Sequence, residues 1–163
     1  MIRRFEEFTS NIVLAYKYVI RIKAYEMNTF GLKGSHVMCI YYIGKNPEGQ
    51  TALELCELCK EDKSQISKVI AYLQRVGYIS ADKKNGSRKY KIRYVITPKG
   101  YEVYTAINQM IVEILYKCED GLSAEELENF YNTFEKINGK LKMIQEEMEL
   151  YKDKYTVRCV KLG

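Results

Sequence analysis

Positive charge gathers in one part of the chain, between Lys60 and Lys99. The 163 residues carry a net charge of +5, but this segment alone holds 11 Lys and Arg against three Asp and Glu, a net of +8. The remainder of the chain therefore has a net charge of −3. Such a concentration is typical of a surface that meets a polyanion, and a merely solvated face is the alternative.

Two Cys residues and the single His are the other candidates for chemistry. Cys56 and Cys59 are three residues apart, so a helix would bring both to one face. A zinc site needs four ligands, and the only His is His36. We therefore expect core thiols, with cysteine-based redox sensing as the alternative, and we expect His36 to be a cap or surface residue.

No motif for catalysis or cofactor binding accompanies these residues. The sequence has no Gly-rich phosphate loop and no nucleophile elbow, and one His cannot support a catalytic triad together with a metal site. We therefore predict that the protein is not an enzyme and uses no cofactor or metal.

Local patterns in residues 51–77 predict two helices joined by a tight turn. Thr51 caps the first helix, with Glu54 as its capping-box partner. The second helix spans residues 62–76 and ends at Gly77. Its apolar side repeats at spacings of three and four and consists of Ile66, Val69, Ile70, Leu73 and Val76.

A basic hairpin follows the two helices. Asn85-Gly86 is a strong signal for a tight turn between a strand that starts at residues 78–81 and a strand at residues 90–97. Like charges that face each other across a hairpin do not stabilise it, so a function is the simpler reason for them. The basic residues around this turn are Lys83, Lys84, Arg88, Lys89 and Lys91.

The helix pair and the hairpin together predict a winged helix-turn-helix that binds double-stranded DNA. An α-helix fits the major groove when one side is anchored and the other is free, and a basic hairpin suits phosphates or the minor groove. Ser64, Gln65, Ser67 and Lys68 are expected to reach base edges. The full set of predicted DNA-binding residues is Thr51, Lys63, Ser64, Gln65, Ser67, Lys68, Tyr72, Lys84, Arg88, Lys89 and Lys91. The alternative is a winged-helix protein-interaction module that does not bind DNA.

Helices are also expected on both sides of this region. Two precede it, at about residues 3–27 and 33–45, and two follow it, the first beginning at Thr97-Pro98 and the second capped by Ser123. The predicted fold class is therefore mainly α with a small β-hairpin (α+β), in the order α-α-α-α-β-β-α-α.

Composition places this fold in a single cytoplasmic domain. Hydrophobic residues make up 47% and charged residues 29% of the chain, which is typical of a globular protein. No run of about 18 apolar residues occurs, so no membrane partner is expected. The odd number of Cys, five in all, and the acidic N-terminal segment favour a reducing compartment over secretion.

The chain resembles MarR-family transcriptional regulators. The resemblance is carried by the helix pair, LELCELCKEDKSQISKVIAYLQRVGYI, and by YVITPKG at the end of the hairpin. It implies a homodimer whose two recognition helices read a pseudo-palindromic operator, more often as a repressor. It also implies one domain over residues 1–163, with a DNA-binding lobe at 33–97 and a helical dimerisation region at 1–27 and 98–150.

The resemblance further implies a pocket for a small aromatic or phenolic effector between the first two helices and the DNA-binding lobe. Tyr16, His36, Cys39 and Tyr42 are the residues expected to line it, and plain core packing is the alternative for them. The sequence departs from the family in the hairpin, where Ser87-Arg88-Lys89-Tyr90-Lys91 replaces an Asp-Arg-Arg pattern. It also has Lys60 where the turn often has Gly, so we expect a strained or differently shaped turn there.

Overall fold

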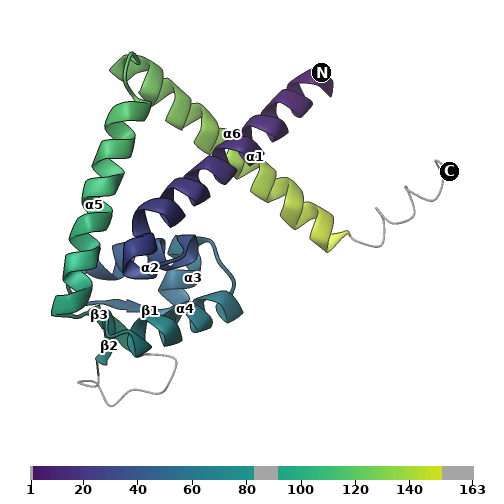
Figure 1. Cartoon of the computed structure of the whole chain (residues 1–163). Coiled ribbons are helices and arrows are strands. Elements are labelled where there is room, and N and C mark those ends of the chain that lie inside the picture. The colour runs from purple at the N-terminus through teal and green to yellow at the C-terminus, as the bar shows by residue number, and fades with distance from the viewer. Residues whose placement is uncertain (1, 83–91, 152–163) are drawn as a thin grey trace. The chain divides into compact units, whose positions relative to one another are not determined.

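The computed structural model describes residues 2–82 and 92–151, and these form the predicted mainly helical fold with a small sheet (Figure 1). The chain divides into two compact units, residues 1–114 and 115–163. In chain order the elements are α1 (Ile2–Met27), the 3-10 helix η1 (Asn28–Phe30), α2 (Gly34–Lys45), β1 (Gln50–Thr51), α3 (Ala52–Cys59), α4 (Lys63–Arg75), β2 (Ile79–Asp82), β3 (Arg93–Ile96), α5 (Pro98–Cys118) and α6 (Ala124–Leu150).

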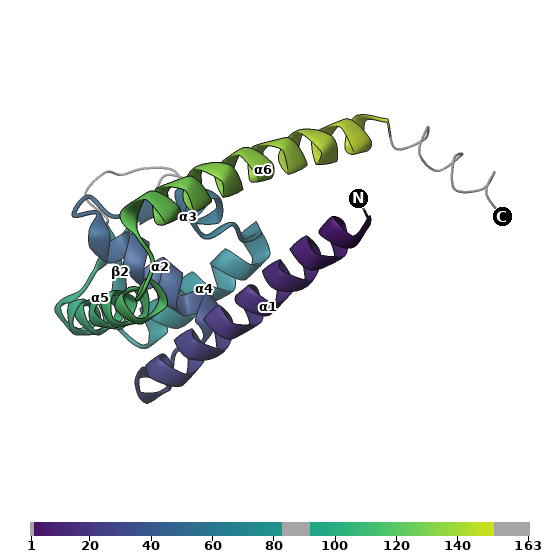
Figure 2. The same cartoon turned by 90° about the horizontal axis from the view of Figure 1, so that it is seen from above.

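The core of the first unit lies where α2, α3 and α4 pack together, as Figure 2 shows from above. The predicted apolar side of α4 is buried there, except for Val76 just beyond its end, which is half-buried. α5 adds its first three turns to the same core. The side chains with almost no exposed surface are Val37, Cys39, Ile40, Ile43, Leu55, Ile66, Val69, Leu73, Val103 and Ile107.

Side-chain caps set the starts of both helices of the pair, and the Thr51–Glu54 capping box is the one that the sequence predicts. The Thr51 hydroxyl accepts a hydrogen bond from the Glu54 amide at 3.2 Å, and the Glu54 carboxylate accepts one from the Thr51 amide at 2.7 Å. The Asp62 carboxylate accepts from the Gln65 amide at the start of α4. In the turn between the helices, Lys60 has a φ of 57°, the one non-glycine residue with positive φ in the described segments. The expected left-handed turn residue is therefore confirmed, and it carries steric strain between its Cβ and backbone.

The sheet contains one strand more than the sequence predicts. Its order is β1-β3-β2 and both pairs are antiparallel, with Thr51 opposite Arg93 and Ile79 opposite Ile96. β1 has only two residues, too few for an alternating pattern to reveal it.

The start of α5 is held against the end of the helix pair. The Thr97 hydroxyl accepts a hydrogen bond from the Gly100 amide and donates to the Gly77 carbonyl. A Cβ on Gly100 would collide with the Tyr78 carbonyl oxygen, so the backbone approach requires glycine. The motif YVITPKG therefore joins the sheet to α5.

The second unit contains the last turn of α5 and the whole of α6. Ser123 and Glu126 form the predicted capping box at the start of α6. None of the residues of α6 is buried. In neither unit does a described helix have the length and apolar content needed to cross a membrane.

Candidate nucleic-acid interface

Helix α4 exposes a polar side opposite its buried apolar side. Lys63, Ser64, Ser67 and Lys68 are exposed, as the prediction of a DNA-facing surface requires. The Ser67 hydroxyl donates a hydrogen bond to the Lys63 carbonyl at 2.7 Å, which orients it along the helix. The first two turns of α4 therefore present two ammonium groups and two hydroxyls together.

Two other predicted DNA-binding residues of α4 make contacts within the protein. The Gln65 amide donates to the Ser35 hydroxyl at 3.3 Å, and Gln65 is half-buried. The Tyr72 hydroxyl donates to the Gly31 carbonyl at 2.7 Å, and its ring stacks on His36 with 4.5 Å between centroids. Tyr72 was expected near the free surface, but its ring lies against α2. Both side chains fix the position of α4 relative to α2.

His36 performs the predicted capping role but is buried, not at the surface. Its Nδ1 accepts a hydrogen bond from the Lys33 amide at 3.1 Å, so it closes the first turn of α2. Burial lowers the pKa of His36, and the charge of Lys33 lowers it further. The neutral imidazole that can accept this hydrogen bond is therefore the favoured form.

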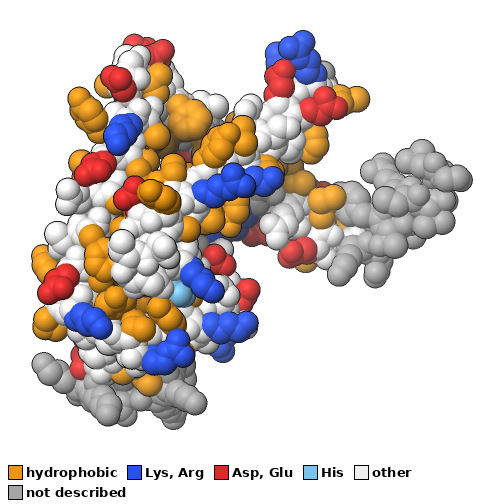
Figure 3. All heavy atoms as spheres, viewed as in Figure 1, with side chains coloured by type: hydrophobic (Ala, Val, Ile, Leu, Met, Phe, Trp, Pro, Cys, Tyr) orange, Lys and Arg blue, Asp and Glu red, His pale blue; other side chains and the backbone are white. Residues whose placement is uncertain are grey.

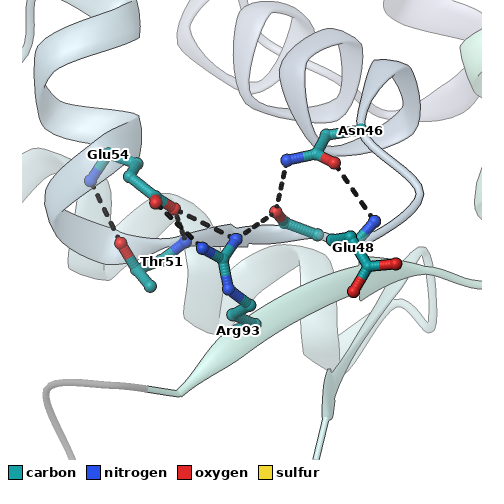
Figure 4. A network of polar contacts seen from close by, with 6 residues as sticks. Asn46, Glu48, Thr51, Glu54 and Arg93 are labelled. Carbon is teal, nitrogen blue, oxygen red and sulfur yellow. Dashed lines mark hydrogen bonds and ion pairs between the residues drawn. The ribbon is translucent and has the colours of Figure 1, made fainter.

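The base of the hairpin is attached to α3 through Arg93, as Figure 4 shows. Its guanidinium contacts the Glu54 carboxylate at 3.1 Å and donates a hydrogen bond to the Gly49 carbonyl at 2.7 Å. The Asn46 amide donates to the same carbonyl oxygen at 2.9 Å. Thr51, a predicted DNA-binding residue, lies within this network as the cap of α3.

Glu54 is the common member of the cap and the ion pair. Its pKa is lowered, mainly by the hydrogen bond from the Thr51 amide and also by the neighbouring Arg93 guanidinium, while burial acts in the opposite direction. Sequence reasoning found Glu54 as a capping residue and missed its pairing with Arg93. Only the register that sets Thr51 opposite Arg93 could have revealed it.

The tip of the predicted basic hairpin lies outside the described residues. Lys84, Arg88, Lys89 and Lys91 all fall between Asp82 and Ile92, so their predicted contacts with DNA remain predictions. β2 and β3, which enter and leave this segment, pair through four registered positions. Figure 3 shows several Lys and Arg side chains on the lower part of the molecule, the part that carries α4.

The four residues of the predicted effector pocket do not share one described cavity. A shallow cavity of about 610 Å³ is lined by Tyr42, Gln50, Glu54, Glu57, Leu58 and Lys60. Tyr42 is the one predicted residue among them. Cys39 is fully buried, His36 stacks on Tyr72, and Tyr16 on α1 is 64% exposed. Within the described ranges, no cluster of three or more His, Cys, Asp or Glu is arranged to hold a metal ion.

Comparison with known proteins identifies the central part of this chain. Residues 32–100 match a family model described as a winged helix DNA-binding domain. Comparison with curated proteins finds no match. This match extends from just before α2 to the start of α5.

Solved structures match most of the chain. The transcriptional regulator SlyA is 21% identical, with a TM-score of 0.75 over 85% of this chain and 96% of that chain. Staphylococcus aureus MarR, in complex with salicylate and kanamycin, is 15% identical, with a TM-score of 0.73 over 86% and 94%. A MarR-family regulator from Listeria monocytogenes, complexed with a 26mer DNA, is 18% identical, with a TM-score of 0.74 over 82% and 87%.

The fold of this protein is that of MarR-family transcriptional regulators. This confirms the fold class and the resemblance predicted from the helix pair and YVITPKG. The matches are described as a winged helix DNA-binding domain and as transcriptional regulators.

Proposed function

We propose that this protein is a cytoplasmic, MarR-like transcriptional repressor that binds a pseudo-palindromic operator as a homodimer. The observation that carries the proposal is α4, which buries its apolar side in the core and presents Lys63, Ser64, Ser67 and Lys68 outward. A helix presented in this way can enter the major groove, where hydroxyls read either base type and an ammonium contacts guanine or phosphate.

The proposed homodimer is supported by apolar side chains that the single chain leaves exposed. On α6 the exposed members include Phe130, Leu141, Ile144 and Met148. They recur with Phe134 and Ile137 at alternating spacings of four and three, which is the pattern of a helix that packs against another helix. A contiguous exposed apolar patch usually marks an interface.

The DNA-binding proposal is tested by selecting duplexes from a random pool and measuring affinity for them by fluorescence anisotropy at several salt concentrations. Lys68→Ala should weaken binding to all duplexes and reduce the slope of log K against log salt by about 1, because one phosphate contact is lost. Ser64→Ala should instead reduce discrimination at one base pair by roughly 1 kcal/mol. Lys140→Ala on α6 removes the same charge elsewhere and is the matched control.

The outcome separates two classes of function. Selected sequences with dyad symmetry and a steep salt dependence support the operator-binding proposal. Binding that is absent, or equal for Lys68→Ala and the wild type, would instead favour a winged-helix module that binds proteins.

We further propose that a small aromatic acid acts as effector and releases DNA. The cavity beside the turn between α3 and α4 supports this, since Tyr42 offers a ring, Leu58 an apolar surface and Lys60 a cation for a carboxylate. A ligand shifts the equilibrium only if it binds the DNA-free arrangement more tightly. Salicylate added to the protein–DNA complex should lower affinity in the wild type and not in Tyr42→Ala, and an equal response in both would exclude this cavity.

A further inference from the structure

Two thiols from different helices meet in the core of the winged helix domain. Cys39 of α2 and Cys59, the last residue of α3, have their Sγ atoms 3.6 Å apart, within hydrogen-bond distance. Both are free thiols, as is Cys56 one turn earlier on α3. The pair joins residues 20 positions apart in the chain, so it differs from the Cys56–Cys59 spacing that the sequence alone makes visible.

The two thiols differ in how far they reach solvent. Cys39 has no exposed surface, whereas Cys59 is half-buried at the edge of the core. A small oxidant can therefore reach Cys59 more readily than Cys39. A partly exposed sulfur beside a fully buried one is the arrangement of an attacking and a resolving thiol.

The surroundings favour the thiolate at Cys59. The pKa of Cys59 is lowered, chiefly by the hydrogen bond that it shares with the Cys39 thiol and also by the positive charge of Lys23 on α1, while burial and Glu61 oppose this. The same hydrogen bond and burial raise the pKa of Cys39. The thiolate is the nucleophile in thiol chemistry, so Cys59 is the reactive member.

We propose that Cys39 and Cys59 form a peroxide-reactive dithiol site that closes to an intrachain disulfide. The Cys59 thiolate attacks one oxygen of a hydroperoxide, breaks the O–O bond and becomes a sulfenic acid, and the leaving oxygen takes a proton to become water or an alcohol. The Cys39 sulfur then attacks the Cys59 sulfur and releases a second water, whose atoms are the sulfenic hydroxyl and the Cys39 proton. The two thiols lose two electrons and the peroxide gains them.

Formation of this disulfide is expected to displace the turn between α3 and α4, which fixes the position of α4. The sulfurs must approach from 3.6 Å to about 2.05 Å, so we expect the end of α3 to shift toward α2. Lys60, which follows Cys59 directly, already holds a left-handed conformation, and Asp62 caps α4 two residues further on. We therefore expect oxidation to shift α4 and weaken DNA binding. This consequence rests on the proposed DNA-binding function, whereas the thiol chemistry does not.

The chemistry is tested without DNA. The reduced full-length protein is treated with hydrogen peroxide and digested without reductant, and its cross-linked peptides are identified by mass spectrometry. The expected product joins Cys39 to Cys59 and is two hydrogen atoms lighter than the reduced pair. Cys39→Ala should instead accumulate a sulfenic acid at residue 59 that dimedone traps, and Cys59→Ser should give neither product. A Cys56→Ser variant, altered one turn earlier on the same helix, should react like the wild type.

Two results would contradict the proposal that Cys39 and Cys59 form this site. One is a cross-link that joins other cysteines while Cys39 and Cys59 stay reduced, and the other is oxidation of the exposed Cys118 before Cys59. Intact mass and circular dichroism of each variant establish that it is folded, so a failure to react cannot arise from unfolding.

The coupling to DNA is tested with the same oxidised samples on a selected duplex. Affinity should fall by about tenfold after peroxide and return with dithiothreitol, in the wild type and Cys56→Ser but not in Cys59→Ser. A quantitative Cys39–Cys59 disulfide with unchanged affinity would overturn the coupling. If the reduced protein bound no duplex at all, the proposed function would fail while the disulfide assay still decided the site.

Discussion

Helices α4 and α6 have similar sequence patterns but opposite environments. Each begins at a side-chain cap, with Asp62 accepting from the Gln65 amide and Ser123 from the Glu126 amide. Each carries apolar residues at spacings of three and four. On α4 those residues are buried, and Leu73 has no exposed surface, whereas on α6 none is buried and Leu141 is 45% exposed.

The difference shows what helical periodicity can and cannot predict. The spacing of apolar residues indicates which side of a helix avoids water, because one side recurs every 3.6 residues. It does not indicate what covers that side. For α4 the cover is α2 and α3 of the same unit. For α6 the pattern is the same, but its own unit buries none of its residues, and the proposed second copy would supply the cover.

The largest expected effect comes from shortening one apolar Leu to Ala on each of these two helices and comparing the loss of stability. Leu73→Ala should destabilise the protein by about 2–5 kcal/mol, because it removes a fully buried side chain and leaves a cavity. Leu141→Ala should have a smaller effect on unfolding that depends on protein concentration, because it acts through self-association. Urea denaturation at several protein concentrations measures both. Equal effects that do not depend on concentration would mean that α6 is covered within its own chain.

A charge on the apolar side of α6 tests the comparison next. Ile144, which is 52% exposed in the single chain, would be buried in the proposed dimer, so Ile144→Asp should weaken dimerisation by about 2 kcal/mol or more, roughly thirtyfold. Sedimentation velocity measures the dimer fraction, and affinity for a palindromic duplex should fall with it. Asn132→Asp adds the same charge on the opposite side of α6 and should change neither. A monomeric wild type would remove the basis for this prediction.

Local signals made the helix pair predictable. Thr51, Glu54 and Asp62 act as caps over three or four residues, and the apolar side of α4 repeats within one helix. Such signals need only neighbouring residues, so the sequence reveals them directly. The left-handed conformation of Lys60 was one of two alternatives suggested by the family resemblance, because the turn often has Gly at this position.

Contacts between distant residues were not predictable. Arg93 and Glu54 are 39 residues apart, and Cys39 and Cys59 are 20 apart, so only the folded chain brings them together. The sequence suggested Cys56 and Cys59 as a pair because they share a helix face, but Cys59 contacts Cys39. Tyr72 falls on a polar part of the α4 pattern and still turns inward, because the His36 ring and the Gly31 carbonyl offer it partners. The basic residues of the hairpin tip were predicted from their charge and from the Asn85-Gly86 turn signal, and they lie outside the described residues.

The smallest expected effect compares two capping boxes that differ in one neighbour. Glu54 and Glu126 both accept from the amide of their cap residue, but only Glu54 has a described ion pair, with Arg93. Gln can replace Glu in a capping box, so Glu54→Gln should remove mainly the ion pair. At pH 7 the loss should be less than about 1 kcal/mol, because both groups are partly exposed. Glu126→Gln is the matched control.

The lowered pKa of Glu54 determines the direction in which this stability difference changes with pH. The pKa of Glu54 is lower in the folded protein than its ordinary value of about 4.3, so its contribution is complete above that pH and is lost as the pH falls through the folded pKa. The stability difference between wild type and Glu54→Gln should therefore shrink on acidification. Urea denaturation from pH 7 to pH 3, with Arg93→Met and the double variant completing a cycle, measures it. If the two single changes add independently in the double variant, Arg93 does not anchor the hairpin to α3 through Glu54, and the Gly49 carbonyl is the contact that remains.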